Sequence, residues 1–458
     1  MPNIDTLISA GRNRRRQPLR SRARTLVVAM LMSLLTPVTA YADCDVPVGG
    51  IPEDAALKFD VGGTRAALAK AGIGVAGTYY GEAFYNWGGL EDGGDYFGAL
   101  YLNTNADLKK LGLWQGVCFF ADAFQFHGNG LTADNTGSLM PVSGLEAVAT
   151  TRVFQIWLEQ KLFDEKLAVR VGQLAVDAEF MLSDGGGKFL NATWGWPSIS
   201  PADLPQGGPA YPLSAPAVRV AIDPNENLRL MAAVYNSHPA PDCANGDPQV
   251  CNDRGLDFEL GDPPLIFAQA AYSYNQKALA GTVKFGGWND FGDFEDQRFD
   301  SGGALIAVSG LPGRVIDDNY GFYGIIDQLI WRAPGSEEEA QGIGVFARVI
   351  GAPTDRNLVD FYFDGGLTFT GMFRGRPGDA LAVGFAYTGI SNRASAFDVD
   401  VGETIARNYE ALIEICYTYE IKPGWSFQPD FQYIFQPGGN VAGVDDAAIL
   451  GARTSITF

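Results

Sequence analysis

Residues 450–458, Leu-Gly-Ala-Arg-Thr-Ser-Ile-Thr-Phe, decide the fold class because they form an alternating segment that ends the chain on an aromatic residue. One face of this segment carries the apolar or small side chains Leu450, Ala452, Ile456 and Phe458, and the other carries Arg453, Ser455 and Thr457. A soluble protein seldom ends on such a strand, whereas this ending is common in bacterial outer-membrane β-barrels. A strand alternates in this way when one face meets lipid and the other a water-filled lumen.

The same period of two recurs along the chain and predicts sixteen strands. In 427–435, for example, aromatic residues alternate with Gln428, Asp430 and Gln432. The expected strands cover roughly 72–85, 98–107, 114–127, 151–163, 167–174, 217–223, 227–235, 266–274, 280–288, 320–331, 343–350, 359–373, 380–390, 408–421, 427–436 and 448–458.

The connections between these strands alternate between short and long. Short turns fall at 164–166, 224–226, 275–277, 334–336 and 422–424, and long polar insertions at 128–150, 175–216, 236–265, 289–319 and 391–407. Short turns at one rim and long loops at the other are typical of outer-membrane barrels. We therefore expect an all-β, transmembrane antiparallel β-barrel of about 16 strands over residues 72–458, with short periplasmic turns and long extracellular loops.

The N-terminal region should lie outside the barrel. Residues 1–42 combine an arginine-rich start, the short apolar run 25–35 and small residues at Ala40-Tyr41-Ala42, which is the pattern of a secretory signal peptide. That apolar run is far shorter than the ~20 residues of a membrane-spanning helix. Residues 43–71 are expected to form a periplasmic segment with a short helix at 62–71.

Charge and cysteine content narrow the function classes. The chain has 33 basic and 53 acidic residues, a net charge of −20, so it lacks the basic footprint of a nucleic-acid-binding protein. Five cysteines in an exported chain leave at least one unpaired. We expect a disulfide between Cys243 and Cys251 in one polar loop, and we interpret Cys118 and Cys416 as small buried hydrophobic residues. The pairing of Cys44, Cys118 and Cys416 stays open.

Catalytic and metal-binding patterns are poor. His127 and His238 each lack nearby partners, and no cofactor or metal is expected. Glu410 and Glu414 could suggest glycosidase chemistry, but both lie on the polar face of one predicted strand, which favours pore lining.

The alternation of inward and outward residues along each strand, together with the length of one loop, identifies candidate lumen residues. The 175–216 loop exceeds the ~12–15 residues of a passive connection, so we expect it to fold into the lumen; a surface cap is the alternative. It contributes Asp177, Glu179, Trp194, Trp196 and Tyr211. The alternation along the strands places on the inward face Glu82, Gln155, Trp157, Glu159, Arg170, Arg219, Arg229, Lys284, Arg348, Glu414 and Asp430.

Several segments resemble the carbohydrate-selective porins of the OprB type. The matching stretches are Gly77–Asn86, Gln125–Gly128, Thr151–Gln160, Val171–Phe180, Trp194–Pro197, Leu204–Pro212, Pro429–Tyr433 and Arg453–Phe458. No match is seen in 242–264 or 290–318. The resemblance implies a sixteen-stranded outer-membrane pore that passes glucose and related sugars down their gradient, without specifying the preferred sugar.

We therefore expect a passive, non-enzymatic channel for monosaccharides and small oligosaccharides. Trp157, Trp194 and Trp196 would stack on sugar rings, and Glu159, Arg170, Glu179 and Arg219 would bond their hydroxyls, each weakly enough to permit release. A general diffusion porin with charge selectivity and an exported glycan hydrolase are the alternatives. The expected partners are sugars, outer-membrane lipid and lipopolysaccharide, and the barrel-assembly machinery through Phe458; monomer and homotrimer both stay open.

Overall fold

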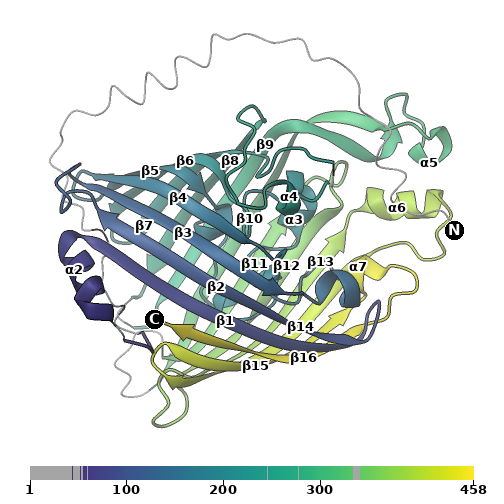
Figure 1. Ribbon diagram of the computed structural model, residues 1–458. Coiled ribbons are helices and arrows are strands. Elements are labelled where there is room, and N and C mark those ends of the chain that lie inside the picture. Colours follow the sequence, from purple (N-terminus) through teal and green to yellow (C-terminus); the bar gives the residue numbers. More distant parts are fainter. Residues whose placement is uncertain are drawn as a thin grey trace, which may run out of the picture.

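A computed structural model describes residues 44, 52, 55–58, 60–244, 246–276, 278–333 and 341–458. In this part of the chain sixteen antiparallel strands close into one barrel in which sequence neighbours pair and β1 pairs with β16 (Figure 1). The expected fold class is confirmed. The expected signal peptide and the turn at 334–336 lie outside the described residues.

The strands are β1 (Ile73–Gly88), β2 (Gly93–Asp107), β3 (Val117–Gly128), β4 (Thr151–Leu162), β5 (Leu167–Leu174), β6 (Ala215–Asn225), β7 (Leu228–Asn236), β8 (Pro264–Tyr274), β9 (Gly281–Asp300), β10 (Gly313–Arg332), β11 (Gly342–Gly351), β12 (Val359–Thr370), β13 (Ala380–Ile390), β14 (Tyr409–Lys422), β15 (Trp425–Phe435) and β16 (Ala447–Thr457). The α-helices are α2 (Thr64–Ala71), α3 (Ile199–Asp203), α4 (Pro248–Cys251), α5 (Ile306–Ser309), α6 (Asn392–Asp400) and α7 (Pro437–Asn440). The 3-10 turns are Val61–Gly63, Val176–Ala178, Gly186–Lys188, Ala192–Trp194 and Pro205–Gly207, and one π turn covers Thr132–Thr136. None of the described helices is long and apolar enough to cross a bilayer.

The chain closes the barrel through its last residues. Thr78 pairs with Thr457 and Gly88 with Ala447, and Gly77 exchanges two backbone hydrogen bonds with Phe458. The C-terminus lies near α2, at the end of the barrel opposite α5, α6 and α7 (Figure 1).

Polarity across the wall is inverted relative to a soluble sandwich. On β15, Phe427 and Phe431 are exposed on the outer face, whereas Gln428, Asp430 and Gln432 are buried. Outward apolar residues match a hydrocarbon environment, and inward polar residues meet water or a polar filling.

The hairpin of β9 and β10 differs from the expectation. Residues 289–319 were predicted as a loop, but both strands are 20 residues long and leave only 301–312 as the connection. Asp296 pairs with Arg314 and Arg393, and Arg298 pairs with Asp400, so charged side chains stabilise the projecting part. The prediction was wrong because it required an apolar face, which a strand beyond the membrane does not need.

Two disulfides are present among the described cysteines. The Cys243–Cys251 bond is confirmed, and Cys416 is free and buried as interpreted. Cys118 is instead bonded to Cys44, so its interpretation as a buried hydrophobic residue was wrong. This bond ties the N-terminal segment to the start of β3, a connection across 74 residues that no local pattern could indicate.

Candidate functional site

The connection between β5 and β6, residues 175–214, fills part of the barrel interior. Its apolar residues Phe180, Phe189 and Trp194 pack in one cluster with inward wall residues such as Phe267 and Phe346. The inward folding expected from its length is therefore confirmed. The connection 129–150 also turns inward: Met140 and Val142 are fully buried, and Gln432 donates to the Val142 carbonyl. This connection had been interpreted as a long polar insertion, although its apolar residues, among them Leu131, Leu139 and Leu145, are compatible with a buried segment.

Glu414 attaches the 175–214 connection to the wall. Its carboxylate accepts hydrogen bonds from the Leu190 amide at 2.6 Å, the Asn191 amide at 3.3 Å and the Trp194 indole Nε1 at 2.6 Å. Glu414 is fully buried, and Trp194 is 2 % exposed. Glu410, four residues earlier on the same face of β14, accepts from the Leu139 and Met140 amides in the same manner.

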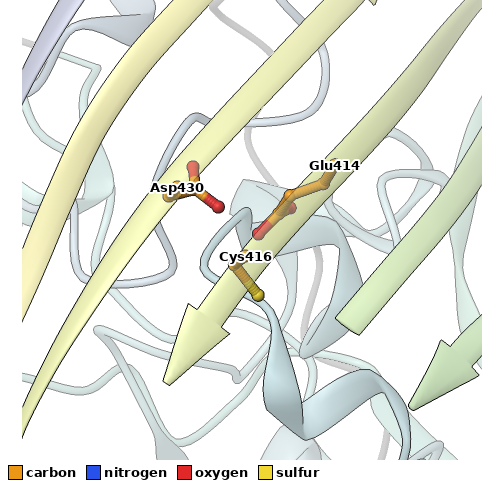
Figure 2. Close-up of side chains that lie close together, drawn as sticks. All are labelled: Glu414, Cys416 and Asp430. Carbon is orange, nitrogen blue, oxygen red and sulfur yellow. The ribbon is translucent and has the colours of Figure 1, made fainter. Parts of the chain in front are cut away.

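Glu414 lies beside Asp430 of β15 and Cys416 of β14 (Figure 2). Among the described residues, these three have ligand atoms close enough to hold a metal ion, all within 4.8 Å of one another. The thiol, however, donates to the Lys188 carbonyl, and both Glu414 oxygens already accept hydrogen bonds from the connection. Cys416 and Glu414 therefore attach the connection to the wall, while Asp430 Oδ1 accepts a hydrogen bond from Gln432 of the same strand. The structure places Glu414, Asp430 and Trp194 together but away from open solvent.

Four charged side chains predicted for the lumen form one cluster. Glu159 accepts from Arg170 at 3.0 Å and from Arg219 at 2.7 Å, and Glu179 accepts from both arginines as well. The Arg170 guanidinium lies 3.7 Å from the centroid of the Trp157 ring. Two positive and two negative groups cancel, so this part of the wall carries no net charge.

A cavity of about 410 Å3, called the loop cavity below, lies between these connections and the wall. Its lining includes the predicted residues Asp177, Trp194, Trp196 and Tyr211, together with Glu146, Gln206, Gln249 and Arg453. Trp196 is partly exposed there, and its indole donates to the Gly207 carbonyl. The Tyr211 hydroxyl donates to the Leu145 carbonyl, and the Tyr211 amide donates to Asp177.

Four of these lining residues were missed as site residues. Arg453 carried a usable signal, because it lies on the polar face of the last strand and donates to Glu82 at 2.5 Å. Gln249 carried none: it lies in an outer connection and reaches the lumen because its carbonyl accepts from Arg152. Glu82 itself also accepts from Ser143 and lies behind Arg453.

Burial shifts the acidity of two carboxyl groups in the connections. Loss of solvation raises the pKa of Asp177 to about 6 and that of Glu146 to about 7. The Leu131 and Thr132 amides donate to Glu146 and oppose its shift. The cavity wall thus contains carboxyl groups that exchange protons near neutral pH and can donate as well as accept hydrogen bonds.

Comparison with known proteins identifies the family. Residues 91–458 match the model of the carbohydrate-selective porin, OprB family. Porin B of Pseudomonas aeruginosa is 23 % identical over 433 residues, covering 87 % of this chain and 90 % of that protein. The putative porin QuiX of Acinetobacter baylyi is 23 % identical over 446 residues, covering 88 % and 93 %.

Solved structures agree on the fold. The high-pH structure of Pseudomonas putida OprB superposes with a TM-score of 0.76 at 23 % identity and covers 87 % of this chain and 97 % of that one. The chain therefore belongs to the OprB family of carbohydrate-selective porins and is a non-enzymatic carbohydrate channel of the outer membrane.

Proposed function

We propose that glucose-like monosaccharides and small oligosaccharides cross this channel passively and bind transiently in the loop cavity. Trp196 would offer the stacking surface, and Asp177, Gln206 and Arg453 would bond sugar hydroxyls. The observation that carries this proposal is the composition of the cavity, in which one partly exposed indole faces a mixture of donors and acceptors. A few polar groups in an otherwise apolar pocket is the usual arrangement for small-molecule recognition.

The buried candidates take a different role in this proposal. Trp194 and Glu414 position the connection rather than touch the sugar: Trp194 borders the loop cavity but is only 2 % exposed, and its indole donates to the buried Glu414. Asp430 is likewise buried beside Glu414. Trp157, Glu159, Arg170, Glu179 and Arg219 would form a rigid, electrically neutral surface. Such a surface neither concentrates nor repels ions strongly, which suits an uncharged solute.

Single-channel recording in planar lipid bilayers tests this function. We expect millimolar glucose or maltose to reduce the ion current of the wild-type channel, and Trp196→Ala to weaken that reduction. Trp87→Ala is the matched control, because Trp87 is exposed on the outer face and its loss leaves the lumen unchanged. A current that stays constant in the presence of both sugars contradicts selective binding and favours a general diffusion porin.

The export and assembly features are part of the same proposal. Residues 1–42 would be removed as a signal peptide, 43–71 would remain as a periplasmic segment, and 72–458 would insert as the barrel among lipid and lipopolysaccharide. The barrel-assembly machinery would recognise the last strand with Phe458, and the assembled form would be either a monomer or a homotrimer. The alternating strands and the apolar outer face support the insertion of residues 72–458 as a barrel.

A further inference from the structure

A second cavity, of about 280 Å3, lies at the short-turn rim of the barrel and is called the rim cavity below. Its wall includes residues near the start of β9 and β11 and near the end of β10 and β12, together with residues of the 175–214 connection. Its volume is close to the lower end of the ~300–1,000 Å3 of small-molecule sites, so it has room for about one sugar unit.

The rim cavity is polar in a mixed way. Asp184 and Lys188 of the 175–214 connection, Asp327 of β10, and Thr368 and Thr370 of β12 all line it. Both signs of charge are present beside two hydroxyl groups. The two carboxylates would repel a simple anion and Lys188 would repel a simple cation, so this composition favours a neutral, hydroxyl-rich ligand.

In the part of the chain that the structure describes, Asp327 has a carboxylate oxygen without a hydrogen-bond donor, which is the main sign of a ligand at this cavity. It is 9 % exposed, and its Oδ1 accepts from the Ser183 hydroxyl at 2.7 Å and the Gly185 amide at 3.0 Å. Its buried Oδ2 accepts no hydrogen bond from any described residue. A buried acceptor without a donor is costly, and a small rotation of the Asp327 carboxylate toward the cavity would let a ligand hydroxyl or a water donate to it.

Glycine keeps this space open. A Cβ added at Gly344 of β11 would lie 2.6 Å from the Thr368 hydroxyl oxygen, closer than real side-chain atoms approach. Any side chain at position 344 would therefore press on the hydroxyl side of the cavity.

Residues 184–188 separate the rim cavity from the loop cavity. Gly186 and Gly187 line the loop cavity, while Asp184, Gly185 and Lys188 line the rim cavity. The two cavities therefore lie on different sides of this short segment.

We propose that the rim cavity is a second saccharide site, used on the periplasmic side of the constricting connection, which binds a neutral pyranose through its hydroxyls. This inference rests on the proposed passage of sugars. Among the residues that the structure describes, no aromatic side chain lines the rim cavity, so it binds without ring stacking and more weakly than the loop cavity. Two successive weak sites allow a solute to move on rather than remain bound.

The test uses sugar added to one side of channels of known orientation. The double variant Thr368→Val, Thr370→Val removes both hydroxyl groups of the rim cavity with little change in side-chain volume. Lys188→Met is a second variant, which removes the charge of an exposed residue that lines the same cavity. Each variant also carries Val308→Cys, which reports the orientation of the channel in the bilayer. Residue 308 lies on α5 and is 79 % exposed, so an impermeant thiol reagent modifies the introduced cysteine from the extracellular side only.

With glucose on the periplasmic side, we expect the sugar dwell time to shorten about two- to tenfold for each lost hydroxyl, the range that follows from the usual net contribution of one hydrogen bond. With glucose on the extracellular side, binding events in the loop cavity should remain unchanged. Trp196→Ala is the reciprocal control and should alter block from both sides.

The outcomes separate the two proposals. If the wild-type channel is blocked by glucose but the threonine and Lys188 variants behave like it from the periplasmic side, the rim site is wrong and the loop cavity stands. If the variants lose block equally from both sides, the rim cavity is no separate site. If glucose blocks the wild type from neither side, both proposals fail.

Discussion

Glu414→Ala should release the connection that narrows the lumen. The substitution leaves three buried donors, the Leu190 and Asn191 amides and the Trp194 indole, without their acceptor. Each unsatisfied buried donor costs about 1–3 kcal/mol. The docked state should therefore lose about 3–5 kcal/mol once relief of the neighbouring Asp430 charge is allowed for.

At about 1.4 kcal/mol per factor of ten, this loss raises the undocked fraction by at least about a hundredfold. Single-channel recording should show a larger and noisier conductance and a weaker block by glucose. Glu414→Gln keeps one acceptor oxygen and should fall between the wild type and Glu414→Ala.

Ile415→Ala is the matched control, because the neighbouring residue on β14 is 42 % exposed on the outer face. Folding of each variant is checked by its heat-dependent mobility in detergent gels. A folded Glu414→Ala channel with wild-type conductance and wild-type glucose block would show that this carboxylate does not hold the connection.

Three further changes give separate tests. Gly187→Trp should lower single-channel conductance without altering thermal stability, since a Cβ at Gly187 meets no atom within 4 Å; unchanged conductance would place this residue outside the path. Cys44→Ser opens a loop of 74 residues and should cost about 4.5 kcal/mol by chain entropy, against about 2.6 kcal/mol for Cys243→Ser, so the reverse order of melting temperatures would be contrary to expectation. The pKa of Glu146 in the folded protein is about 7, above its usual 4.5, so its contribution to stability is fully present below pH 4.5 and is lost as the pH rises through 7. Glu146→Gln should therefore reduce the dependence of the melting temperature on pH between pH 5 and 8. An unchanged pH dependence in this variant would exclude Glu146 as its cause.

The strands and their closure were predictable because the signal for them is local. Each residue of a membrane strand faces either hydrocarbon or the barrel interior. Apolar residues are therefore required at every second position, as in 427–435 and 450–458. The same reasoning failed at 289–319, where β9 and β10 continue beyond the membrane and ion pairs replace the apolar face.

The candidate site was predictable in part. Parity correctly directed Glu159, Arg170 and Arg219 inward, and the length of 175–216 indicated a connection inside the lumen. Parity could not show that Gln249 reaches the loop cavity from an outer connection, since that depends on contacts between segments about a hundred residues apart.

The sequence by itself determined the barrel, its sixteen strands and the inward direction of its polar residues, because the solvent on each side of the wall constrains every residue independently of distant contacts. Only the tertiary structure decided which inward groups stay open and which hold the interior connections. Glu414 and Arg453 both face the inside of the barrel. Glu414 is covered by three hydrogen-bond donors of the connection, whereas Arg453 lines a cavity. That division depends on how one long segment packs against many strands, and no periodicity within a strand records it.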